Sequence, residues 1–197
     1  MNTNIFSNNE DGISINFTAV FKTLNDELAG HNEALSLICA GDYVLQLNGY
    51  RGTADVDAFF SSNTVIDNII REVGDIFGIN RPGELWLNNS LSNLNPEPPG
   101  QYCKVIHQFS NLTVLAVDLL YLVGMKLTSA RGQDMRDVAE IIRKTKELQP
   151  FELSGKLTEM GFQIDISILL DVYGEALGME WLEQFYNENE HKLGGLF

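Results

Sequence analysis

The chain has 197 residues, of which 44% are hydrophobic and 20% are charged, and its formal net charge is −14. These values are ordinary for a folded protein with one sizeable core, or one core and a small appendage. The negative charge argues against sequence-independent binding to DNA, because such binding depends on many Lys and Arg contacts to phosphate.

Membrane and targeting segments are not indicated by the sequence. No run approaches the ~18 apolar residues of a membrane span, and the N-terminal stretch MNTNIFSNNEDG lacks the basic and apolar regions of a signal peptide. Cys39 and Cys103 form no C-x-x-C pair, and the three histidines are scattered, which argues against a zinc site or a disulfide framework. We therefore expect a cytoplasmic protein that does not contact a membrane.

The charged residues are unevenly distributed along the chain. Six of the 13 basic residues fall within the 21 positions from Lys126 to Lys146, and from Glu147 onward ten acidic residues stand against two lysines. A basic face on an acidic chain can bind a polyphosphate, or it can be the solvated side of a helix. Charge alone favours the second interpretation.

The first half of the chain alternates between helical and strand patterns. Residues 1–15, rich in Asn and Ser, are expected to be a flexible lead-in. Asn63 is placed to cap a helix that Gly78 would end. The apolar spacing predicts, in order, a helix over 17–28, a buried strand over 34–40, a short helix over 42–48, a strand over 53–60 and a helix over 64–77.

The second half begins with a loop-rich segment over 79–101, which holds four of the five prolines and one short strand candidate, ELWLN. The order of all these elements is typical of an α+β domain followed by a helical tail. The elements predicted next are strands over 102–109 and 112–117, joined as a hairpin, then a helix from Asp118, a helix from about Asp134 to Glu147, and two or three short helices after Pro150.

Two aspartates, Asp55 and Asp57, stand two positions apart in the stretch GYRGTADVDAFF, residues 49–60. On a strand, residues i and i+2 point to the same face, ~6–7 Å apart along the strand. Like charges at this distance repel unless a cation lies between them. Mg²⁺ (or Mn²⁺) suits this position, because it binds one or two carboxylates together with substrate phosphates. The pair therefore predicts either a metal site for nucleotidyl transfer or a solvated strand edge.

The glycine turn before this stretch extends the pattern. Ala40 and Gly41 end the predicted strand, and a glycine turn can offer backbone N–H groups to an anion. The segment CAGDYVLQLNGYRGTADVDAF resembles the nucleotidyltransferase superfamily signature, a Gly-[Gly/Ser] turn followed by Asp-hydrophobic-Asp, with Ala40 in place of the first glycine. The part GYRGTADVD is similar to the version in the AbiEii-like and DUF6036 families, which belong to many toxin–antitoxin and phage-abortive systems.

A second motif points to the same families. The segment YLVGMKLTSARGQDMRDVAEII is similar to the helical K-x-x-x-x-R-x-x-D-x-x-D segment that follows the hairpin in them. By this resemblance Lys126 reaches the nucleotide phosphates and Arg131 supports it. Asp134 and Asp137 would complete the site or brace its basic residues.

The resemblance covers about residues 34–146. It implies a nucleotidyltransferase-like mixed β-sheet flanked by helices over 16–147, with a C-terminal helical segment over 148–197. The catalytic residues that it implies are Asp55, Asp57 and Lys126, of which the two aspartates also bind metal. The nucleotide-binding residues that it implies are Gly41, Arg51, Thr53, Lys126 and Arg131.

Local alternatives stay open for several of these residues. Asp134 and Asp137 also have the N-cap and N3 spacing of a capping box. Lys126 can instead extend its stem along an apolar helix face with its charge in water. Arg51 can pair with Asp55 or Asp57.

Two functions stay open as well. In the first, the chain transfers NMP from an NTP–Mg²⁺ complex to a hydroxyl of a tRNA 3′ end or a protein. In the second, it is a non-catalytic protein that keeps the fold to bind a cognate toxin or antitoxin. Ala40 favours the second, as does the lack of a carboxylate in the predicted strands 102–109 and 112–117. Glu84 and Asp118 are the nearest candidates for a third carboxylate.

Overall fold

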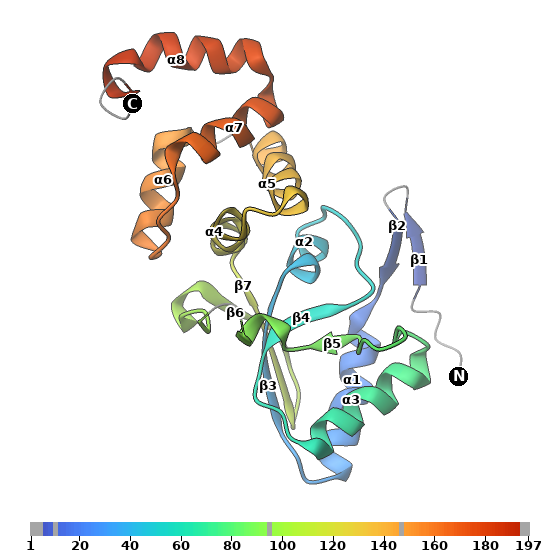
Figure 1. Cartoon of the computed structure of the whole chain (residues 1–197). Helices are drawn as coiled ribbons and strands as arrows, with labels where there is room; N and C mark the ends of the chain where they lie inside the picture. Colours follow the sequence, from blue (N-terminus) through green and yellow to red (C-terminus); the bar gives the residue numbers. More distant parts are fainter. Residues whose placement is uncertain (1–5, 10–11, 94–95, 146–147, 194–197) are drawn as a thin grey trace. The chain divides into compact units, whose positions relative to one another are not determined.

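The computed structural model of the chain describes residues 6–9, 12–93, 96–145 and 148–193. The chain forms two compact units, Met1–Leu119 and Leu120–Phe197. The first combines a sheet with helices and the second is helical (Figure 1). The predicted α+β fold, a mixed sheet flanked by helices and followed by a helical segment, is confirmed. The boundary between the units falls within the predicted domain of residues 16–147.

A short β-hairpin precedes the first helix. Strands β1 (Phe6–Asn9) and β2 (Gly12–Ile15) pair antiparallel, with Phe6 opposite Ile15. The described part of the expected lead-in therefore has regular structure, and its residues 1–5 and 10–11 lie outside the described residues. Backbone hydrogen bonds do not require apolar side chains, so a short polar hairpin has no hydrophobic pattern by which to predict it. Ile15 is buried, and its carbonyl oxygen accepts a hydrogen bond from Gln46 Nε2 at 2.8 Å.

The sheet of the first unit has five strands in the order β5–β4–β3–β7–β6 (Figure 1). Strand β3 pairs antiparallel with β4 and parallel with β7, β4 pairs parallel with β5, and β6 and β7 form an antiparallel hairpin. The sheet is therefore mixed. The strands are β3 (Leu35–Ala40), β4 (Val56–Phe59), β5 (Leu87–Asn88), β6 (Cys103–Gln108) and β7 (Leu112–Val117).

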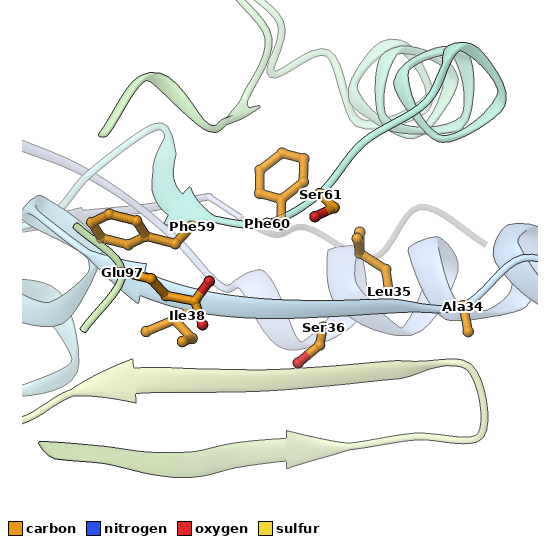
Figure 2. A pocket seen from close by; sticks show the side chains of 8 residues that line it. All are labelled: Ala34, Leu35, Ser36, Ile38, Phe59, Phe60, Ser61 and Glu97. Carbon is orange, nitrogen blue, oxygen red and sulfur yellow. The ribbon is translucent and has the colours of Figure 1, made fainter. Parts of the chain in front are cut away.

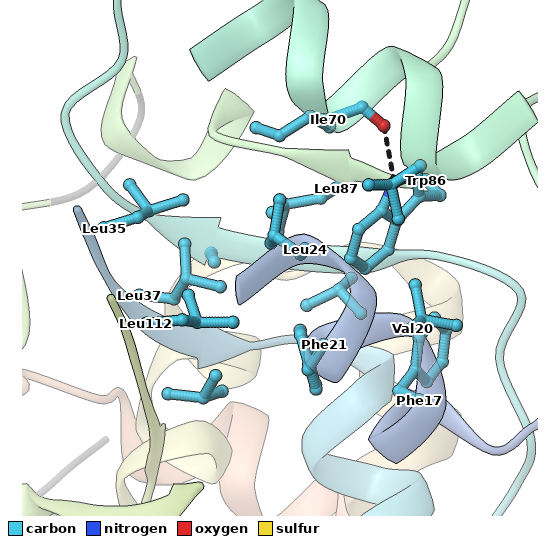
Figure 3. Packing of buried hydrophobic residues seen from close by; sticks show 14 of the residues in the cluster. Phe17, Val20, Phe21, Leu24, Leu35, Leu37, Ile70, Trp86, Leu87 and Leu112 are labelled. Atoms are coloured by element: carbon cyan, nitrogen blue, oxygen red, sulfur yellow. Dashed lines mark hydrogen bonds between the residues drawn. The ribbon is translucent and has the colours of Figure 1, made fainter. Parts of the chain in front are cut away.

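Helices α1 and α3 contribute the apolar side chains that cover one face of this sheet. Figure 3 shows Phe21 and Leu24 of α1 beside Leu37 of β3, with a hydrogen bond from Trp86 Nε1 to the Ile70 carbonyl oxygen of α3, 2.9 Å long. The capping prediction for α3 is confirmed. Asn63 Oδ1 accepts hydrogen bonds from two backbone N–H groups of the first turn, and Gly78 follows the helix in the left-handed conformation. The helices of this unit are α1 (Phe17–Gly30), α2 (Asp42–Leu47) and α3 (Thr64–Phe77), with short 3₁₀ turns at Ser90–Asn93 and Gly100–Tyr102.

Alternation along the strands separates the two faces of the sheet. Val56 and Ala58 of β4 belong to the buried core, as does Leu37 of β3. Because successive side chains of a strand point to opposite faces, Asp57 lies on the face away from this core. The candidate carboxylate is thereby kept out of the apolar interior.

The second unit is built around α7, which packs against α5, α6 and α8. Pro150 begins α6 at its first turn, where the missing N–H of proline has no cost. The predicted end of α5 near Glu147 lies outside the described residues. In the described part of the chain, no helix is both long and apolar enough to cross a membrane. The helices are α4 (Leu119–Ser129), α5 (Gly132–Thr145), α6 (Pro150–Glu159), α7 (Ile166–Leu177) and α8 (Met179–Leu193).

Candidate functional site

Gly41 and Asp57 form the closest packed part of the candidate site. Gly41 joins β3 to α2 with φ +65° and ψ −145°, a conformation that side chains disfavour. A β-carbon on Gly41 would lie 2.9 Å from Asp57 Oδ2, closer than non-bonded atoms normally approach. The proximity follows from the ladder, in which Asp57 is paired with Ala40. Glycine is therefore required here both for its backbone angles and for the space that the carboxylate occupies.

Asp55 lies just outside the strand that was expected to contain it. Strand β4 begins at Val56, so the prediction of a strand over 53–60 was too long at its start. The reason is local hydrogen bonding: Thr53 Oγ1 accepts from the Asp55 N–H at 3.3 Å and donates to Asp55 Oδ1 at 2.8 Å. Such side-chain bonds compete with a sheet ladder. The buried hydroxyl of Thr53 therefore orients the Asp55 carboxylate.

Gln46 of α2 fixes this turn from the other side. Its Oε1 accepts from the Thr53 backbone N–H at 2.9 Å, and its Nε2 donates to Ile15 as described above. Both ends of one amide are thus bonded, which ties the N-terminal hairpin, α2 and the Thr53 turn together. No sequence motif had singled out Gln46, because its two partners are backbone groups distant in sequence.

Arg51 is bonded at the start of α2. Its Nη2 donates to Asp42 Oδ1 at 2.6 Å, and both side chains are about a third exposed. A pair this exposed contributes at most about 1 kcal/mol, so its effect is chiefly to hold the arginine in place. Gly41 is the N-cap of α2, and Asp42 is the first residue of this helix. The bond to Asp42 places the Arg51 guanidinium beside the glycine turn, and the pairing of Arg51 with Asp55 or Asp57 stays a prediction.

The two candidates for a third carboxylate lie in different places. Glu84 lines a small cavity together with Asp55 and Arg81. Asp118 directly follows β7. Because β7 pairs in parallel with β3, Asp118 lies at the same end of the strands as Gly41, which directly follows β3. Within the described residues, no group of three His, Cys, Asp or Glu side chains is arranged to hold a metal ion.

Burial raises the pKa of the Cys103 thiol on β6, and the negative charges of Asp118 and Glu97 raise it further. These two carboxylates therefore both lie near the start of β6. Glu97 had no role in the sequence motifs, since it lies in the proline-rich loop between the short 3₁₀ turns.

In the second unit, Lys126 is buried and doubly paired. Its Nζ donates to Asp134 Oδ1 at 2.8 Å and to Asp137 Oδ2 at 2.7 Å. Burial acts to lower the pKa of Lys126, but the hydrogen bonds and charges of the two aspartates outweigh it and raise the pKa above 10.5. Gln133 Nε2 adds a bond to Asp137 Oδ1, so the cluster is well satisfied.

Both local alternatives for this cluster are wrong. The capping box fails because α5 begins at Gly132, which places Asp134 inside the first turn instead of at the N-cap. A lysine with its charge in water is also excluded, since only 6% of Lys126 is exposed. Arg131 stays exposed in the connection between α4 and α5.

The predicted site residues thus fall into local groups. In the first unit these are Gly41 with Asp57, Thr53 with Asp55, and Arg51 with Asp42; in the second unit, Lys126 joins Asp134 and Asp137.

The family model for nucleotidyltransferases of unknown function, DUF6036, matches residues 16–148. The chain belongs to this family. The matched residues contain both motifs noted in the sequence. Nucleotidyltransferases take an NTP as substrate, and membership of this family implies an NTP for this chain. No curated protein sequence and no solved structure matches the chain significantly.

Proposed function

We propose that this protein transfers the NMP group of an NTP to a hydroxyl group of a tRNA or a protein. The observation that carries the proposal is the close approach of Gly41 to the Asp57 carboxylate at the end of β3. Gly41 makes room for the Asp57 carboxylate, and the oriented Asp55 carboxylate lies two residues away. Two carboxylates held this close together do not favour the stability of the fold, so we infer that they serve a function. The sheet face away from the core then offers the Asp57 carboxylate to a substrate.

The donor set fits Mg²⁺ (or Mn²⁺). Asp55 and Asp57 supply carboxylate oxygens, and Mg²⁺ commonly binds one or two carboxylates together with substrate phosphates. Gly41 has no side chain to displace Oδ2 of Asp57, since a β-carbon there would lie 2.9 Å from this oxygen. When bound, the ion would neutralise the repulsion between carboxylates and phosphates and stabilise the charge that develops on the transferred group.

The residues of the first unit then have separate tasks. Thr53 holds the Asp55 carboxylate in one orientation, and β4 holds Asp57 rigidly. Arg51, which its bond to Asp42 holds beside the Gly41 turn, would contact a phosphate oxygen there through its planar guanidinium. As the acceptor oxygen forms its bond to the α-phosphorus, pyrophosphate leaves, and an aspartate carboxylate is the candidate to take the hydroxyl proton.

Lys126 and Arg131 have roles that the resemblance only implies. The bonds of Lys126 to Asp134 and Asp137 support a positioning role, in which the lysine joins α4 to the start of α5. The exposed Arg131, in the short connection between these helices, is then the better candidate to contact phosphate. Its planar guanidinium suits phosphate oxygens.

The pairing of Lys126 also favours the second candidate function. A predicted catalytic cation whose charge is balanced by two aspartates suits a family member that has lost catalysis and binds a toxin or antitoxin partner. The two functions differ in whether nucleotide binds in a Mg²⁺-dependent manner.

Thermal unfolding with ATP, GTP, CTP and UTP, with and without Mg²⁺, tests the proposal. A nucleotide at 100 times its dissociation constant stabilises the fold by about 2.7 kcal/mol, which raises Tm by roughly 5–10 °C. We expect Asp57→Asn to abolish the Mg²⁺-dependent increase and pyrophosphate release, whereas Asp171→Asn, at an exposed position of α7, leaves both unchanged. Absence of any Mg²⁺-dependent increase in the wild type would overturn the proposal in favour of the non-catalytic function.

A further inference from the structure

A hollow of about 280 Å³ opens in the first unit between β3, β4 and the proline-rich loop (Figure 2). This volume is near the lower end of the ~300–1,000 Å³ typical of small-molecule pockets. The side chains that matter for its chemistry are Ser36, Ile38, Phe59, Phe60, Ser61 and Glu97.

The hollow lies on the same face of the sheet as Asp57. In the β3–β4 ladder, Asp57 is opposite Ala40 and Phe59 is opposite Ile38. Phe59 is thus two residues beyond Asp57 on the same side of β4, about 6–7 Å along the strand. A ribose separates the base of a nucleotide from its α-phosphate, so a base in this hollow would leave the phosphates near the carboxylates.

The lining combines flat apolar surface with a single charged group. Phe60 is half-buried and Phe59 is buried, so aromatic carbon forms part of the wall, and Figure 2 shows Glu97 beside Phe59 and Ile38 at one end. A carboxylate here repels phosphate, which argues against a polyphosphate as the occupant. It attracts a flat, neutral group that carries N–H donors.

We propose that this hollow binds the nucleobase of the NTP and selects guanine, with Glu97 as the selecting residue; this assignment rests on the proposed function. An ionised carboxylate only accepts hydrogen bonds. Guanine presents two adjacent donors, N1–H and the N2 amino group, to such an acceptor. Adenine and cytosine each place a ring acceptor next to their amino group, and uracil has one donor between two carbonyl oxygens.

The hydroxyls of Ser36 and Ser61 complete the match. A hydroxyl can donate to a carbonyl oxygen such as O6 of guanine, and these two serines lie on opposite sides of the hollow, on β3 and just beyond β4 (Figure 2). Adenine has an amino group in place of O6, and this group does not accept the hydrogen bond that a serine hydroxyl donates.

Two binding measurements on the full chain test the assignment. In the first, dissociation constants of the four NTPs with Mg²⁺ are measured for the wild type, Glu97→Gln and the control Glu72→Gln, which changes an exposed glutamate of α3. We expect GTP to bind at least about tenfold more tightly than the others, and Glu97→Gln to remove about tenfold or more of this preference. Glu72→Gln is expected to keep it.

The second measurement separates the hollow from the metal site. Binding of guanosine and adenosine, which lack phosphates, is followed by ligand-observed NMR without Mg²⁺. Guanosine binding that survives Asp57→Asn and is lost in Glu97→Gln supports the hollow as a guanine site.

Equal binding of the four NTPs together with no preference for guanosine would overturn the assignment, even where Asp57-dependent binding of NTP persists. Guanosine binding without any Mg²⁺-dependent NTP binding would instead overturn the proposed transfer reaction and retain the guanine site.

Discussion

Gly41 and Asp57 are in contact across the β3–β4 ladder, with Asp57 Oδ2 only 2.9 Å from the position that a β-carbon of Gly41 would take. The contact joins two parts of the motif that are 16 residues apart in sequence. It explains why this second position of the turn is a glycine, while the preceding residue, Ala40, is buried with its methyl group accommodated. The substitution of the first motif glycine by Ala40 therefore does not remove the space beside Asp57.

Gly41→Ala is expected to destabilise the protein and to weaken nucleotide binding. The backbone angles of Gly41 are strained for a residue with a side chain, at a cost of about 1–3 kcal/mol, and the new methyl group would displace the Asp57 carboxylate. Gly49→Ala is the matched control, because Gly49 has φ +74° and open space around a β-carbon. Thermal unfolding should show a larger loss for Gly41→Ala than for Gly49→Ala, at about 2–4 °C per kcal/mol. Equal losses would contradict the steric role of Asp57.

Thr53→Val is expected to weaken Mg²⁺-dependent nucleotide binding with little change in fold. The substitution keeps the side-chain shape but removes the hydroxyl that donates to Asp55 Oδ1, at a cost of about 0.5–1.5 kcal/mol. Thr53→Ser keeps a hydroxyl and should retain most of the affinity. Titration of each variant with NTP and Mg²⁺ measures the difference. Similar affinities for the Val and Ser variants would show that this bond does not orient the carboxylate for binding.

Lys126→Met is expected to lower the free energy of unfolding by about 3 kcal/mol or more. It leaves Asp134 and Asp137 without their shared cation, and removal of one partner from a buried ion pair typically costs ~3–5 kcal/mol. Lys156→Met breaks only an exposed i,i+4 pair with Glu152 and should cost about 0.5 kcal/mol or less.

Urea denaturation compares these two lysine variants. A partial recovery in the double variant Lys126→Met, Asp137→Asn would identify the uncompensated carboxylate as the cause. A loss in Lys126→Met no greater than in Lys156→Met would refute a structural role for the cluster.

The imidazole of His107 should make stability fall in mild acid. Burial lowers its pKa below 6.5, and its ring lies 5.6 Å from Phe21 and 5.8 Å from Phe109. The unfolded chain therefore binds a proton more readily than the folded one, so this contribution is present above pH 6.5 and is lost as pH falls from 6.5 through the lower pKa of the folded state. Between pH 7.5 and 5, Tm of the wild type should fall more than Tm of His107→Phe. His191→Phe, at an exposed histidine, should follow the wild type, and parallel curves for His107→Phe would contradict the prediction.

Most elements of the fold were predictable because their signals are local. The cap of α3 is an example: Asn63 Oδ1 accepts from the N–H groups of Val65 and Ile66, and Gly78 adopts the left-handed conformation that ends the helix. The β6–β7 hairpin was likewise visible as two apolar runs joined by two polar residues. The N-terminal hairpin was missed, since β1 and β2 are short and polar.

The sequence by itself determined which residues are candidates for chemistry, because motif spacing and residue type are properties of the chain. It identified the Asp55–Asp57 pair, Gly41 and the Lys126 motif as candidates, and the family model that matches residues 16–148 spans all of them. Only the tertiary structure decided what each side chain contacts. Ladder pairing brought Asp57 to Gly41, and burial forced Lys126 to take two carboxylate partners. Such contacts depend on strand register and on the desolvation of charges, which arise only when distant segments pack together.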